Sequence, residues 1–325
     1  MYQRTQQSRL LCAFFFEFKS RTWLRSVKKK RKHNAWLKEI DDLVRGSSGG
    51  FLFGIPLVYT MEVWWIGSFI KPSEMLIALA VTFGVVFWLT RTEGFRRTRN
   101  PQFFAYFADS VEALAIGLVG ATFLLILLRE ITLSTPLNEA LGKLTIESVP
   151  FAIGVAMARA FLSGDRYSPT EDEDTKQKSD SQPKKRSPFD AINLNATLED
   201  IGATLTGALV VAFNIAPTDE VPMLAAATTP LSLLGIIAAS LGVSYSIVFV
   251  AGFTHQAKRQ HQRGIFQRPL SETVMAYLVS LAASACLLIF FHQLTWTDPT
   301  SLWLEYTLVL GLPATIGGAA GRLAV

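Results

Sequence analysis

The stretch Asn214-Ile215-Ala216-Pro217-Thr218-Asp219-Glu220-Val221-Pro222-Met223 sets two carboxylates between two prolines, with apolar sequence on both sides. A charged side chain at the depth of the hydrocarbon costs at least about 2 kcal/mol, so acids inside an apolar run need a reason. A related segment, Thr60-Met61-Glu62-Val63, stands in the same relation to an earlier apolar run. This repetition indicates a duplicated membrane protein whose acids are in register.

Charge in this chain of 325 residues is confined to blocks that separate apolar runs. Charged residues make up 18% of the chain, against about 25% in an average soluble domain. Each apolar run is close to the ~20 residues that a helix needs to cross the hydrocarbon, and none alternates as the strands of a membrane barrel do. We therefore predict an all-α, polytopic transmembrane helical bundle of eight spans. The runs are 49–70, 74–90, 107–128, 146–163, 198–216, 228–252, 271–291 and 304–321.

Two shifted self-alignments support the duplication. Residues 109–159 align with 272–322 at a shift of 163 positions without a gap, and 14 of the 51 positions are identical. A shift of 158 aligns the earlier segments, including Glu62 with Glu220. Since each copy would hold four spans, an even number, both copies enter the membrane from the same side. The prediction is two tandem, parallel four-helix repeats, at 46–163 and 198–325.

Basic residues are distributed unevenly among the connections between spans. The connections 91–106 and 253–270 each hold four Lys or Arg, whereas 217–230 and 293–303 hold none. By the positive-inside rule, this distribution predicts that both termini lie in the cytoplasm.

Two polar segments lie outside the repeats. Residues 1–45 form a basic tail with twelve Lys or Arg against four acids, and 164–197 form the longest linker. The tail is either a juxtamembrane segment that binds anionic lipid, or a solvated cytoplasmic tail that only fixes orientation, or a stretch before a later translation start. It resembles a nucleic-acid-binding arm, but beside eight spans we expect no nucleic acid. The linker is rich in charge, Ser, Gln and Pro, so we expect it to be disordered and cytoplasmic.

Two acid–base pairs recur with the same spacing. Asp109 and Arg159 are 50 residues apart, as are Glu272 and Arg322. Each acid opens the third span of a copy and each arginine closes the fourth, so we predict two ion pairs near the cytoplasmic end. One interpretation is that these pairs are structural and hold two helices together. The other is that they control gating. Glu112 lies one turn deeper than Asp109 and aligns with a methionine, an asymmetry that makes it a further site candidate.

The acids near the prolines are the main candidates for binding. Pro56 in the first copy, and Pro217 with Pro222 in the second, remove backbone donors and are expected to interrupt the helix. Broken helices at membrane depth are tolerated where they line a wet cavity, and their carbonyls can bind cations. One hypothesis brings residues of both copies together around a proton or cation, and the alternative makes 217–223 a solvated loop outside the bilayer. The candidates are Thr60, Glu62, Thr218, Asp219 and Glu220.

The sequence contains no catalytic or metal motif. The patterns His-Glu-x-x-His and Gly-x-Ser-x-Gly and the P-loop do not occur in it. The four histidines fall in tails, loops or span ends, and two cysteines are too few for a metal cluster. We therefore expect no enzyme activity, no metal and no cofactor.

At Ala216-Pro217-Thr218-Asp219-Glu220-Val221-Pro222-Met223-Leu224, with Asp109-x-x-Glu112-Ala113 upstream, the chain resembles a family of uncharacterised bacterial integral membrane proteins, first collected from cyanobacteria and rhizobia. The likeness covers residues 36–325. It implies a multi-pass protein of the bacterial inner (plasma) membrane with about seven spans, and no assigned activity.

Transport of a cation, proton or small solute is the function that immersed acids and broken helices favour. We expect the site to lie between the two repeats, where parallel-repeat transporters bind their substrates. The alternative is a non-transporting membrane scaffold or accessory subunit, in which every acid is paired or solvated.

Overall fold

In the computed structural model, the described residues are 36, 39–92, 103–158, 194–250 and 269–323. The chain divides into two compact units, residues 1–43 and residues 44–325. Every regular element in the described residues is a helix and none is a strand, which confirms the predicted all-α class. Most of the predicted basic tail, and the predicted linker as far as residue 193, lie outside the described residues.

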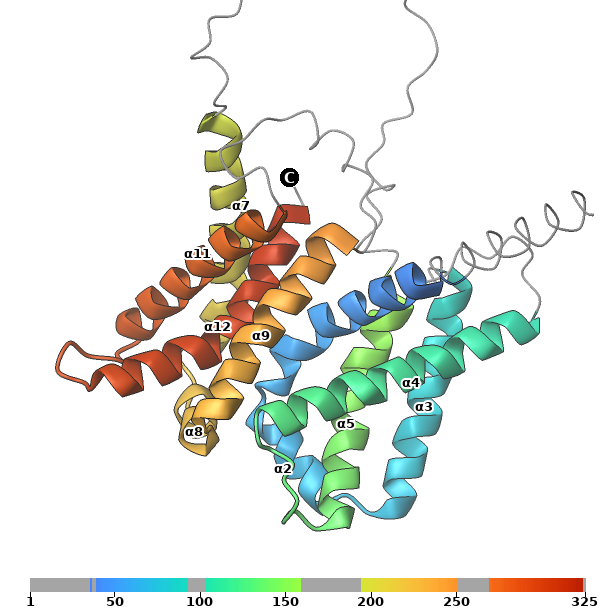
Figure 1. Ribbon diagram of the computed structural model, residues 1–325. Helices are drawn as coiled ribbons and strands as arrows, with labels where there is room; N and C mark the ends of the chain where they lie inside the picture. The colour runs from blue at the N-terminus through green and yellow to red at the C-terminus, as the bar shows by residue number, and fades with distance from the viewer. Residues whose placement is uncertain (1–35, 37–38, 93–102, 159–193, 251–268, 324–325) are drawn as a thin grey trace, which may run out of the picture. The chain divides into compact units, whose positions relative to one another are not determined.

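The helix Glu39–Val58, named the first helix, precedes α2, and its residues from 44 onward belong to the larger unit. Four more helices follow it in the first half of that unit. Proline occupies the first position of α3, where its missing N–H would have no helical partner. The four helices are α2 (Met61–Phe69), α3 (Pro72–Thr92), α4 (Phe103–Leu127) and α5 (Leu137–Ala156) (Figure 1).

The second half follows the same order of long and short helices. A short helix, α8, forms within residues 217–230, which the sequence predicts to be a connection between two spans. The run Leu224-Ala225-Ala226-Ala227 consists of strong helix formers, which explains this difference. The elements are α7 (Leu194–Ile215), α8 (Glu220–Ala227), α9 (Pro230–Tyr245), the π-helix η2 (Ser246–Val250), α11 (Pro269–Phe290) and α12 (Thr300–Leu323).

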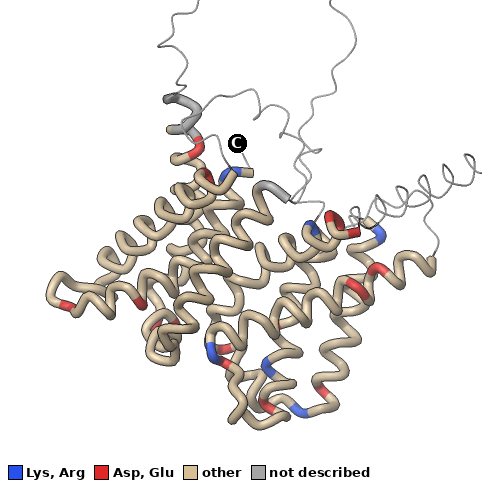
Figure 2. The backbone as a smooth tube through the Cα atoms, viewed as in Figure 1, with Lys and Arg blue, Asp and Glu red and all other residues tan. Residues whose placement is uncertain are grey.

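Four helices of the described residues are long and apolar enough to cross a membrane: α3, α4, α11 and the continuous segment Pro230–Val248. Two further pairs are apolar enough together but bent by 89° at a short break: the first helix with α2, and Asp200–Ile215 with α8. Counting each bent pair as one span gives six, against the eight predicted. Along α3, α9 and α11, charged residues are confined to the helix ends or missing (Figure 2).

The two remaining predicted spans, 146–163 and 304–321, overlap α5 and α12, which are the inner helices of their halves. Helix α5 begins nine residues before its predicted span, at Leu137. Helix α5 packs against α2, α3 and α4, and α12 packs against α7, α8, α9 and α11. Every residue of α12 from Leu308 to Ala319 is buried. Because neighbouring helices cover it, α12 needs close packing more than an apolar surface for lipid.

Pairs of glycines bring these inner helices close to their neighbours. Gly207 of α7 lies against Gly317 of α12, and Gly49 of the first helix lies against Gly154 of α5. A Cβ atom built on any of the four would collide with the backbone carbonyl of its partner. The contacts therefore resemble the small-residue interfaces that membrane helices use.

We expect Gly207→Ala to lower the free energy of unfolding by about 1–3 kcal/mol, because the added methyl group meets backbone atoms of α12 that cannot move aside easily. Gly202→Ala, on the same helix, is the matched control. Nothing lies within 4 Å of a Cβ at Gly202, and alanine favours a helix over glycine by up to about 1 kcal/mol. Thermal unfolding of the purified variants in detergent measures both, and equal stability of the two would contradict the close packing of α7 on α12.

Candidate functional site

The first bend lies at Tyr59 and Thr60, between the first helix and α2. Thr60 is extended, with φ −108° and ψ 104°, so the helix stops and α2 begins at the next residue. The buried Trp64 donates from Nε1 to the carbonyl oxygen of Val58 at 2.8 Å, which satisfies a carbonyl at the helix end. The sequence predicts that Pro56 interrupts the helix. In the structure Pro56 lies within the last turn, and the helix continues to Val58.

The second bend lies between α7 and α8, at residues 216–219. Pro217 has no N–H with which to continue the helix, and the Thr218 hydroxyl donates to the carbonyl oxygen of Ile215 at 2.6 Å. The side-chain amide of Gln293 donates to the carbonyl oxygen of Thr218 at 3.4 Å, so the segment after α11 supports the break. Pro222 falls in the first turn of α8, where it interrupts nothing.

A cavity of about 530 Å³ lies against both bends. Its lining comes from residues 56–62 of the first half and 210–220 of the second. Asp219 is not among the lining residues, and its side chain is exposed. Two carboxylates that are 158 residues apart in the sequence therefore line one cavity. The predicted candidates that line it are Thr60, Glu62, Thr218 and Glu220.

The two carboxylates of this cavity differ in burial. Glu62, in the first turn of α2, is exposed. Glu220, in the first turn of α8, is 9% exposed, and its Oε2 has no hydrogen-bond partner in the described part of the chain. The alternative of a solvated loop therefore describes Asp219 but not Glu220. Because a buried carboxylate oxygen without a donor is costly, Glu220 is the less compensated acid of the two.

Two further polar residues line the cavity, Tyr59 and Asn214, which the sequence analysis does not identify. Asn214 donates from Nδ2 to the carbonyl oxygen of Val210 at 2.9 Å. The 158-residue shift aligns Tyr59 with Pro217 and Asn214 with Pro56. In this alignment Tyr59 and Asn214 each stand opposite a proline, and that difference between the two halves is the sequence signal that could have identified them.

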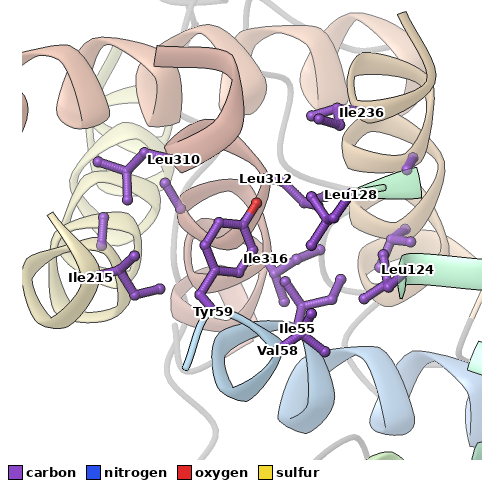
Figure 3. Close-up of a cluster of buried hydrophobic side chains, with 14 of the residues drawn as sticks. Ile55, Val58, Tyr59, Leu124, Leu128, Ile215, Ile236, Leu310, Leu312 and Ile316 are labelled. Carbon is purple, nitrogen blue, oxygen red and sulfur yellow. The ribbon is translucent and has the colours of Figure 1, made fainter. Parts of the chain in front are cut away.

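Tyr59 also connects the first bend to α12. Its hydroxyl donates to the carbonyl oxygen of Val309 at 2.7 Å, although the two residues are 250 positions apart. Val309 precedes Pro313 by four residues, so its carbonyl has no helical N–H to accept from. The Tyr59 ring lies between the first helix and α12 (Figure 3). It belongs to a buried cluster that also contains Ile55, Val58, Leu310, Leu312 and Ile316.

The structure describes both members of one predicted ion pair. Arg322, 1% exposed at the end of α12, pairs with Glu272 in the first turn of α11. In the other pair, Arg159 lies outside the described residues, while Asp109 is buried on α4 and has an interaction partner. Glu112 is half-buried on α4 and also has an interaction partner, and it is not among the residues that line the cavity.

A second polar group lies where α4 connects to α5, and the sequence analysis does not identify it. Lys143 of α5 pairs with Glu139 one turn earlier at 3.0 Å and with Glu130 of the connection at 3.3 Å. Burial raises the pKa of the Glu130 carboxyl, against the opposing effect of the Lys143 ammonium. Glu147 lies one turn further along α5 and is fully buried. The 163-residue shift aligns these four residues with Tyr306, Leu302, Gln293 and Leu310, so the repeat does not point to them.

The lining of the cavity at the bends is mainly apolar, from Pro56, Leu57, Val210, Val211 and Ile215, and most of its polar side-chain atoms are oxygens. Two carboxylates, two threonine hydroxyls, a phenol and an amide line it. Hard cations prefer such oxygen ligands. Across the described residues, no group of three or more His, Cys, Asp or Glu side chains is arranged to hold a metal ion. The chemistry that this arrangement supports is reversible binding of a proton, a small cation or a polar solute.

Residues 42–325 match the profile of a family described as "Putative integral membrane protein (DUF2391)". The chain belongs to this family. The match confirms the resemblance to an uncharacterised family of integral membrane proteins that the sequence indicates. It covers both bends and both halves of the larger unit, so the cavity lies within the part that defines DUF2391 proteins. No curated protein and no solved structure matches the chain.

We expect Tyr59→Phe to lower the free energy of unfolding by about 1–3 kcal/mol, because it leaves the buried Val309 carbonyl without a partner. Tyr277→Phe is the matched control, since the buried Tyr277 hydroxyl has no partner in the described residues and its loss should cost little. Thermal unfolding in detergent compares the two. If Tyr59→Phe proves as stable as Tyr277→Phe, the hydrogen bond to α12 does not stabilise the fold.

Proposed function

We propose that this protein transports a proton, a small cation or a small polar solute by way of the cavity at the two bends. The supporting observation is that Glu62 and Glu220, one from each half, line the same cavity. Acids in an apolar protein are costly, and gathering two of them beside broken helices is most simply explained by a ligand. Discontinuous helices form the substrate sites of several transporter architectures.

The proposal includes two tandem, parallel repeats, 46–163 and 198–325. The two bends have the same angle, 89°, and occur in segments that the 158-residue shift aligns. Within the described residues, the non-glycine residues with positive φ are Arg129 at 62° and His292 at 60°, which are 163 positions apart. The glycine contacts of the inner helices also occupy aligned positions. These paired features support a duplicated four-span unit.

We further propose eight spans with both termini in the cytoplasm. Each bent pair would cross as one broken span, and α5 and α12 would cross as inner helices that protein covers. The distribution of Lys and Arg among the connections supports this orientation, in a bacterial plasma membrane. The basic tail, residues 1–45, would then meet anionic lipid at the cytoplasmic face.

The two acids of the cavity are suited to different steps. Glu62, the exposed acid, is placed to take up a ligand from water. Glu220, the buried acid with an oxygen that lacks a partner among the described residues, is placed to hold the ligand after it loses water. Threonine hydroxyls and the backbone carbonyls at the bends would complete an oxygen shell.

Flux into proteoliposomes tests this function, with the proton, Na⁺ and K⁺ as the first substrates. We expect Glu62→Gln and Glu220→Gln each to lower the flux by about tenfold to a hundredfold, the effect of losing a hydrogen bond to a charged group worth about 1.5–3 kcal/mol. Glu74→Gln is the control, because Glu74 is an exposed acid at the start of α3, away from the cavity lining.

Two outcomes would count against the proposal. Undiminished flux in both cavity variants would remove these acids from the mechanism. Absence of flux for every substrate tried, in protein that remains folded, would favour a non-transporting scaffold or accessory subunit.

A further inference from the structure

Glu147 of α5 is an acid with no exposed surface. Neither of its carboxylate oxygens has a hydrogen-bond partner in the described part of the chain. An ionised carboxylate in such surroundings would lack both water and a donor, a state that proteins avoid by neutralising the group. Glu147 therefore needs a neutralising partner that the side chains around it do not supply.

The nearest basic residue on its own helix is fully engaged elsewhere. An ammonium group has three N–H donors. The Lys143 Nζ has three acceptors: the Glu130 carbonyl oxygen at 3.2 Å, the Glu130 Oε2 at 3.3 Å and the Glu139 Oε1 at 3.0 Å. No donor of Lys143 is left for Glu147. With all three acids ionised, this group of three acids and one lysine would carry a net charge of −2, and a proton on Glu147 reduces it to −1.

No charged group on the neighbouring elements of the described chain donates a hydrogen bond to Glu147. Glu130 is itself an acid, and it shares the ammonium group of Lys143 with Glu139. The Glu130 side chain is 14% exposed, whereas Glu147 has no exposed surface. Besides Glu130, Glu139 and Lys143, the charged groups of the described elements around α5 are Glu39, Asp41, Asp42 and Arg45 on the first helix, Glu62 on α2, Lys71 before α3, Glu74 and Arg91 on α3, Asp109 and Glu112 on α4, and Arg129 after α4.

We propose that Glu147 is a proton-binding site in the first half, separate from the cavity at the two bends. A proton neutralises a carboxylate through one oxygen atom and requires no cage. A metal ion requires several oxygen ligands, and the described residues assemble no such group here.

The second half shows that this position does not require an acid for packing. The 163-residue shift aligns Glu147 with Leu310, which is fully buried on α12, and aligns Lys143 and Glu130 with uncharged residues. An apolar residue at a buried position is the less costly choice for stability. The acid of the first half is therefore retained for chemistry that the second half does not perform.

Infrared spectroscopy of the full chain in lipid tests the proposal, because protonated carboxyl groups have a carbonyl stretching band that carboxylates lack. We expect a protonated-carboxyl band in the parent protein at neutral pH that disappears reversibly at alkaline pH. The band should be missing from Glu147→Gln and from Glu147→Leu. The second substitution introduces the residue type found at the aligned position, Leu310. The band should persist in Glu74→Gln, which removes an exposed acid.

Thermal unfolding of the same samples separates protonation from folding. Glu147→Leu should be at least as stable as the parent, since it removes a buried polar group that has no partner in the described residues. A parent protein without a protonated-carboxyl band at neutral pH would overturn the proposal whatever the variants do, and so would a band that Glu147→Leu leaves unchanged. The measurement does not involve flux, so its result is independent of whether the cavity transports anything.

Discussion

The hydrogen bond from the Tyr59 hydroxyl to the Val309 carbonyl is the interaction on which the junction of the two halves depends. Pro313 withholds the N–H that this carbonyl would accept from in an unbroken helix. In an apolar interior every such group must find a partner inside the protein. A residue at the first bend provides it, so the end of the first helix is held against the inner helix of the second half. The cavity borders this junction, because Tyr59 also lines it.

Close backbone contacts explain why the inner helices are less apolar than their neighbours. Helices α5 and α12 are covered by protein, so their sequences are selected for small volume and for internal polar partners rather than for contact with lipid. Gly154 and Gly317 make the approach possible. Hydropathy alone therefore identifies the outer helices, α3, α4, α9 and α11, more readily than the two that organise them.

The sequence predicted best what the two halves have in common. Glu62 and Glu220 could be paired from their alignment, and the common spacing paired Glu272 with Arg322. The features that it missed are those in which the halves differ. Glu147, Lys143 and Tyr59 align with residues of other chemistry, and their importance comes from burial and from partners on other helices. Pro56 and Pro222 both lie inside helices, and the breaks fall beside them. A proline in the first helical turn removes an N–H that has no helical partner, so Pro222 does not interrupt α8. Pro56 removes one donor of the first helix, which ends two residues later at Val58.

The two bends have an electrostatic consequence that the carboxylates alone do not suggest. Helices α2 and α8 both begin at the cavity, and each carries its glutamate in the first turn. The start of a helix has a partial positive charge of roughly half an elementary unit, from peptide dipoles that point the same way. The partial positive charges at the starts of α2 and α8 therefore offset part of the negative charge of Glu62 and Glu220. The cavity is consequently closer to neutral than a count of its acids implies.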